Sequence, residues 1–186
     1  ATTPPDDFRE EFNGLVPADW AEPRHSNQDA ETAAKIYPYD SPADGMLKYR
    51  INFRLPHDVM DAVTTAMMES RGISLAEFCQ GTYLDAGGVR ALQDAGHLVA
   101  AHGHSHTPFS RLDSDDLATD INKNLECLGG ILGARPRWVS YPYGRDWAVP
   151  NDTAAFCQRF GFSFGLTLKA GWNGPGADPT RLNRIN

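Results

Sequence analysis

The sequence has few cysteines, no long apolar run and no surplus of basic residues. Its 186 residues include only three cysteines, and none of them forms a Cys-x-x-Cys pair. This pattern excludes a disulfide framework and a cysteine-based zinc site. We expect Cys79, Cys127 and Cys157 to be buried thiols in a reducing compartment.

The charge and the missing apolar segments also limit the partners. The formal net charge is −7 and no cluster of Lys and Arg offsets it, so nucleic acid is not an expected partner. No run of about 18 apolar residues is present, so no membrane span is expected. The first residues, ATTPPDDFREEF, lack the basic and then apolar segments of a secretory signal. Together with the cysteines, this predicts a cytoplasmic location.

What the chain does contain is typical of a folded domain. Hydrophobic residues make up 41% and charged residues 22%, and a chain of this length buries about 70% of its unfolded surface. Residues 1–45 are rich in proline and acidic residues, which predicts a helical or loop-rich N-terminal arm or insertion. Residues 46–186 have the stronger apolar periodicity and are expected to form the main domain.

The periodicity of residues 46–186 predicts strands that alternate with helices. The expected strands are 49–53, 97–101, 137–141 and 162–168. The expected helices are 57–70, one after Asp85, one after Asp113, and 151–160. This order is typical of an α/β fold with a mainly parallel sheet or barrel, whose functional loops lie at the C-terminal ends of the strands.

Three histidines, His102, His104 and His106, follow directly after the expected strand 97–101. Such a cluster at a strand end favours a divalent-metal site, because imidazole suits Zn, Fe, Ni and Co. His102 and His104 would share a face if the strand continued, whereas His102 and His106 would lie together in a helix.

Two other metal-site families have histidine patterns of this kind. A metallo-β-lactamase site requires His-x-His-x-Asp-His, but here His106 stands at the Asp position and Thr107 at the last His position. An amidohydrolase barrel opens with His-x-His on its first strand, whereas this cluster lies past the middle of the chain. Both interpretations are therefore weaker than one that explains a longer stretch of sequence.

The segment from Gly96 to His106 resembles the second motif of the polysaccharide deacetylases of the NodB-homology type, Gly-His-x-x-x-x-His-(Ser/Thr)-x-Ser-His. His102 and His106 match its two metal-binding histidines, and His104 becomes a bystander. Tyr141-Pro-Tyr-Gly144 resembles the third motif of one branch, and Arg181-Leu-Asn-Arg-Ile185 resembles its terminal segment. The resemblance covers about residues 46–186.

The resemblance implies a distorted (β/α) barrel, either complete or lacking its first strands. It implies a metal-dependent hydrolase, with zinc as the first choice of metal, that removes an N- or O-acyl group, usually acetyl, from an amino sugar or polysaccharide. His102 and His106 would bind the metal, and the backbone N–H of Tyr143 would stabilise the oxyanion. Pro142 and Gly144 would shape that backbone and contact the substrate.

The family's first motif, Phe-Asp-Asp-Gly, supplies a third metal ligand and the general base, and it is not evident here. Asp6-Asp7 is the only Asp-Asp pair upstream of the histidines, and Phe8 stands in place of the glycine. The favoured interpretation treats residues 8–56 as an insertion and places the true Asp pair before Ala1. Two alternatives remain: a noncatalytic carbohydrate-binding or truncated relative, and a deformylase or deacetylase that acts on a nucleotide sugar.

Overall fold

The computed structural model describes residues 5–21 and 27–185. The chain divides into two compact units, residues 1–83 and residues 84–186. Each unit has its own core and is described separately.

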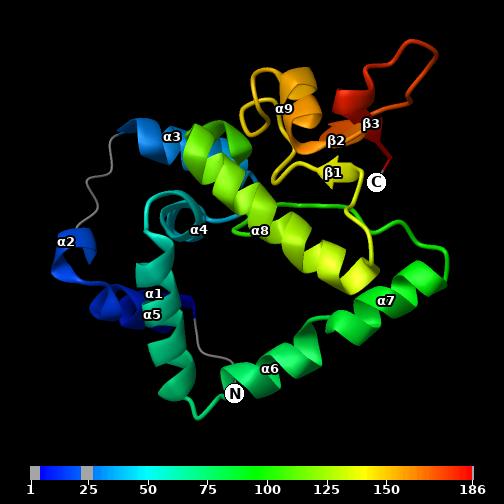
Figure 1. Cartoon of the computed structure of the whole chain (residues 1–186). Coiled ribbons are helices and arrows are strands. Elements are labelled where there is room, and N and C mark those ends of the chain that lie inside the picture. Colours follow the sequence, from blue (N-terminus) through cyan, green and yellow to red (C-terminus); the bar gives the residue numbers. More distant parts are fainter. Residues whose placement is uncertain (1–4, 22–26, 186) are drawn as a thin grey trace. The chain divides into compact units, whose positions relative to one another are not determined.

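The described part of the N-terminal unit is helical (Figure 1). Its core contains Phe12, Val16, Val63 and Met67 and is built mainly where the first and fifth helices pack together. The helices are α1 (Pro5–Leu15), α2 (Ala18–Ala21), α3 (Asn27–Ile36), α4 (Pro42–Phe53), α5 (His57–Glu69) and α6 (Leu75–Thr82).

The strand expected at residues 49–53 is wrong, because this segment is the end of helix α4. Ser41 caps the helix by accepting a hydrogen bond from the Asp44 backbone N–H, and Pro42 occupies its first turn. Leu47 and Ile51, four residues apart, both pack against the core of this unit, which is a helical spacing. The alternation at 49–53 is therefore a part of a longer helical pattern.

The C-terminal unit combines helices with a parallel sheet (Figure 1). Strand β1 (Trp138–Ser140) pairs with β2 (Phe164–Ala170), and β2 pairs with β3 (Leu182–Arg184), in the order β1-β2-β3. The elements are α7 (Ala86–Asp94), α8 (Ser114–Leu132), β1 (Trp138–Ser140), α9 (Thr153–Phe160), β2 (Phe164–Ala170) and β3 (Leu182–Arg184), with 3-10 turns at Phe109–Arg111 and Pro179–Arg181.

The expected α/β class with a parallel sheet is confirmed, but the sheet is open. In residues 5–21 and 27–185 the named strands number three, and they do not close into a barrel. The strand expected at 97–101 is reduced to one bridge, between Ala101 and Val139. Leu98 is 63% exposed, so this segment is not covered as an internal strand of a parallel sheet would be.

The helices of the C-terminal unit begin at or near the positions that the sequence predicts, but α8 continues past Gly129 and Gly130 to Leu132. The side chains of Asp85, Asp113 and Asp152 accept backbone hydrogen bonds at the starts of α7, α8 and α9. Gly133 and Gly161 end α8 and α9 in the left-handed conformation.

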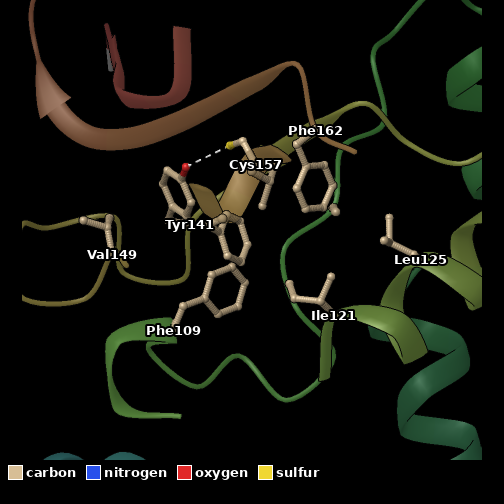
Figure 2. Close-up of a cluster of buried hydrophobic side chains, with 10 residues drawn as sticks. Phe109, Ile121, Leu125, Tyr141, Val149, Cys157 and Phe162 are labelled. Atoms are coloured by element: carbon tan, nitrogen blue, oxygen red, sulfur yellow. Dashed lines mark hydrogen bonds between the residues drawn. The ribbon is translucent and has the colours of Figure 1, made fainter. Parts of the chain in front are cut away.

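The core of this unit packs aromatic rings between α8, α9 and the sheet (Figure 2). Phe109 contacts Tyr141 edge-on at 6.2 Å between ring centroids. The buried Tyr141 hydroxyl donates to the Thr180 carbonyl at 2.8 Å and lies 3.5 Å from the Cys157 sulfur. Burial raises the pKa of both Tyr141 and Cys157, so both are neutral at physiological pH.

The cysteines are all free, but only one is fully buried. Cys157 lies in the core, whereas Cys79 is partly exposed and Cys127 is exposed. The expected burial is therefore correct for Cys157 alone. In the described part of the chain, no helix has both the length and the apolar character required to cross a membrane.

The close packing of Tyr141 against β2 predicts that Gly165→Ala destabilises the fold. A Cβ at residue 165 would overlap the Tyr141 hydroxyl and the Thr180 carbonyl, and overpacking of this kind costs about 1–3 kcal/mol. Gly130→Ala in helix α8 is the control, because the added methyl meets no atom within 4 Å and alanine favours helices by about 1 kcal/mol. Urea unfolding measures both variants. Equal stability of Gly165→Ala and the wild type would contradict the packing.

Candidate active site

The imidazole rings of His102 and His106 lie together, with their centroids 4.9 Å apart. His102 follows Ala101, which bridges to β1, and its Nδ1 lies 2.6 Å from the carbonyl oxygen of Ser140 at the end of that strand. A carbonyl only accepts, so Nδ1 carries the proton and Nε2 carries the lone pair. The strand end thus fixes the tautomer of His102.

The histidines meet through a turn, and neither a continued strand nor a helix forms here. Gly103 has φ +77° and His106 has φ +57°, both in the left-handed region. This conformation is costly for histidine. A Cβ at residue 103 would lie 2.9 Å from both Asp120 Oδ2 and Phe109 Cε1, so glycine is required there.

Two polar residues of helix α8 hold the backbone of this loop. Asp120 accepts hydrogen bonds from the backbone N–H groups of His104 and Ser105, at 2.9 and 2.8 Å. Asn124, one helical turn later, accepts from the His102 N–H at 3.1 Å. Asp120 is buried, with 7% of its surface exposed. These bonds stabilise the turn that brings the two rings together.

The turn Tyr141–Gly144 lies against the histidines. The Tyr143 ring is 4.8 Å from the His106 ring and 5.6 Å from Trp147. Tyr143 has φ +60° and Gly144 has φ +55°. Gly144 accepts a hydrogen bond from the Leu168 N–H at 2.7 Å, and an added Cβ there would overlap the backbone of β2. The turn is therefore tied to the second strand.

A pocket of about 220 Å³ opens beside these residues. Of the residues expected to form the site, His102, His106, Tyr143 and Gly144 line it. Pro142 is fully buried and is not among the lining residues, so its contribution is to the turn. The complete lining is His102, His106, Ser140, Tyr141, Tyr143, Gly144, Thr167, Leu168 and Arg184.

The electrostatic surroundings keep His106 neutral. Desolvation of its ring is the main cause, and the nearby His102 adds to it, so the pKa of His106 falls below its ordinary value of 6.5. A neutral imidazole has a lone pair available to bind a metal.

The structure brings no third ligand to the two imidazoles in the part of the chain that it describes. No group of three or more His, Cys, Asp and Glu side chains there could hold a metal ion. Asp6 and Asp7 lie in the first turn of helix α1 instead of at a strand end, and Asp6 pairs with Arg9. The two histidines therefore fit two positions of a metal site and leave the carboxylate position unfilled.

The match to a family profile decides between the metal-site families. The profile described as "Polysaccharide deacetylase" matches residues 55–165, which include the histidine loop and the Tyr141–Gly144 turn. The chain belongs to the polysaccharide deacetylase family. The metallo-β-lactamase and amidohydrolase interpretations of the histidines are thereby removed.

Individual relatives of this deacetylase-family chain are distant. It is 29% identical over 56 residues to a peptidoglycan-N-acetylglucosamine deacetylase of Bacillus cereus, and the match spans 30% of this chain and 20% of that protein. The Streptococcus pyogenes deacetylase PplD has a similar fold, with a TM-score of 0.52 and 15% identity over all of this chain and 87% of the other. The deacetylase domain of BpsB from Bordetella bronchiseptica gives a TM-score of 0.48 at 19% identity over 55% of this chain and 48% of the other.

Sequence reasoning missed Asp120 and Asn124, and it assigned no role to Arg184. A signal for the first two was present, since each directly precedes an apolar residue, Ile121 or Leu125, that faces the core from helix α8. A carboxylate and an amide at this spacing lie on one side of the helix. Arg184 belongs to the terminal segment Arg181–Ile185, whose resemblance to the family gave this arginine no role.

The hydrogen bonds of Asp120 predict that Asp120→Asn destabilises the histidine loop. An amide has one acceptor oxygen, so one backbone N–H would lose its acceptor and face an NH₂ group. The expected cost is about 1–3 kcal/mol in the free energy of unfolding.

The matched control is Glu126→Gln, an exposed substitution on the same helix, which should change stability by less than about 0.5 kcal/mol. Chemical denaturation measures stability, and the NMR signals of the His102 and His106 rings report the loop. If both stay unchanged in Asp120→Asn, the loop does not depend on this carboxylate.

Proposed function

We propose that the pocket is the histidine part of a metal-dependent hydrolase site that removes an N- or O-acyl group, acetyl first, from an amino sugar or polysaccharide. The observation that carries this proposal is the convergence of His102, His106 and the Tyr143 turn on one pocket in a chain of the polysaccharide deacetylase family. The deacetylase names of the relatives agree with the reaction type.

His102 and His106 would hold the divalent cation, with zinc as the first choice because two imidazoles suit it. A bound cation of this kind supplies Lewis-acid chemistry and lowers the pKa of water. The bond from Nδ1 to Ser140 orients His102 so that Nε2 is the ligating nitrogen. The lowered pKa of His106 favours the neutral, ligating form.

The backbone of Tyr143 has a separate role in the proposal. Hydrolysis of an acyl group develops negative charge on the carbonyl oxygen, which backbone N–H donors stabilise when they are fixed in place. The left-handed Tyr143 and Gly144, tied to Leu168, hold this backbone at the pocket. Its N–H would donate to the developing oxyanion.

A second candidate function is a noncatalytic carbohydrate-binding relative. One observation favours it: none of the residues that line the pocket is an aspartate or glutamate. General-base catalysis needs a group within hydrogen-bond reach of the attacking water. Hydrolysis therefore requires a carboxylate beyond the lining residues, whereas sugar binding does not.

The metal assignment predicts that zinc binding depends on both histidines. After equilibrium dialysis against zinc, elemental analysis should find that His102→Ala and His106→Ala each weaken binding at least about tenfold. His104→Ala is the matched control, because His104 belongs to the same loop and does not line the pocket. If His102→Ala and His106→Ala both bind zinc as tightly as the wild type, these histidines do not form a metal site.

The missing carboxylate predicts low activity for the chain by itself. Assayed with acetylated amino sugars and zinc, it should show little turnover, because none of the lining residues can act as the carboxylate base. Product analysis should separate acetate from formate and so test a deformylase of nucleotide sugars.

The same assay on a chain with both Asp6→Asn and Asp7→Asn provides the decisive comparison. Robust metal-dependent deacetylation that survived this double substitution would show that the base lies elsewhere and would contradict the account. Sugar binding without product release would favour the noncatalytic alternative.

A further inference from the structure

The residues that line the pocket include a permanently positive side chain and no negative one. Arg184 is the one cationic side chain of the lining that stays charged at every physiological pH, and no acidic residue lies among the nine lining residues. The pocket is therefore positive, although the chain as a whole has a formal charge of −7.

The backbone of Arg184 is fixed by the sheet. It ends strand β3, is in register with Ala170 of β2, and accepts a hydrogen bond from the Gly171 N–H at 3.3 Å. Thr167, which also lines the pocket, donates to the Leu182 carbonyl of the same strand at 3.0 Å. The strand thus fixes the backbone of Arg184 beside the pocket that this exposed residue lines.

The guanidinium of Arg184 has no ionic partner among the residues that the structure describes. The contrast with Arg181, three residues earlier, is direct, since Arg181 pairs with Asp146 at 2.8 Å. A guanidinium offers planar donors that match the two oxygens of a carboxylate or a phosphate. A positive, acid-free pocket with such a group is complementary to an anion.

We infer that Arg184 is a specificity residue that selects an acylated sugar with an anionic group, a carboxylate or a phosphate ester, beside the acyl group. The inference rests on the proposed function only in taking the pocket as the sugar site. The acyl group would face His102 and His106, and the anionic substituent would face β3. A neutral acetylated sugar would leave the guanidinium without a partner.

The test measures equilibrium binding of three sugars by ligand-observed NMR at low ionic strength. N-acetylglucosamine is the neutral probe, N-acetylglucosamine 1-phosphate carries a phosphate, and N-acetylmuramic acid carries a carboxylate. At least one anionic sugar should bind about fivefold more tightly than the neutral one, the upper end of the gain expected for an exposed ion pair. Added salt should reduce the difference. The tighter anionic probe identifies the substituent.

Arg184→Gln should reduce the preference to less than about twofold, and Arg184→Lys should keep part of it, because the charge remains and the paired donors are lost. Lys169→Gln is the matched control, since it removes one positive charge from an exposed residue of β2 that does not line the pocket. It should leave the preference unchanged.

Equal binding of neutral and anionic sugars by the wild type, or a preference that survives Arg184→Gln, would overturn the inference. Failure of the proposed function has a different signature, namely zinc binding that ignores His102 and His106. The two failures are therefore distinguishable.

Discussion

The site depends on one buried carboxylate. Asp120 reaches from helix α8 to two successive backbone N–H groups of the histidine loop. A buried carboxylate is costly unless hydrogen bonds compensate it, and backbone donors do so here. These hydrogen bonds stabilise the left-handed conformation of the loop, which orients the His106 ring toward His102. The helix is itself fixed by Ile121 and Leu125 in the core, so the core positions the imidazoles.

The parallel sheet brings the second half of the site to the same place. Strand β1 ends at Ser140, whose carbonyl orients His102, and the chain then continues directly into the turn that contains Tyr143. Functional groups collect at the C-terminal ends of parallel strands because every strand runs in the same direction. The pairing of β2 with β3 adds Thr167 and Arg184 to the pocket. Three strands thus suffice to assemble it.

Local signals in the sequence were sufficient for the helices around the site, because caps such as Asp113 and Asp152 act through neighbouring backbone groups. The pairing of His102 with His106 also followed from a motif. The strand prediction for residues 49–53 was wrong because a short stretch of alternating apolar residues fits both a strand and part of a helix. Whether the sheet closes into a barrel, and what Asp120 binds, both depend on contacts between segments that are distant in the sequence. The periodicity of the sequence contains little information on such contacts.

The proposed function makes His102 and His106 two ligands of one metal site beside the Tyr143 turn. Anomalous diffraction at the zinc absorption edge, from crystals of this chain soaked in zinc, tests it most directly. We expect a peak between the two rings, at about 2.0–2.1 Å from His102 Nε2 and from one ring nitrogen of His106. A zinc peak only elsewhere on the molecule, with none at this pair, would contradict it.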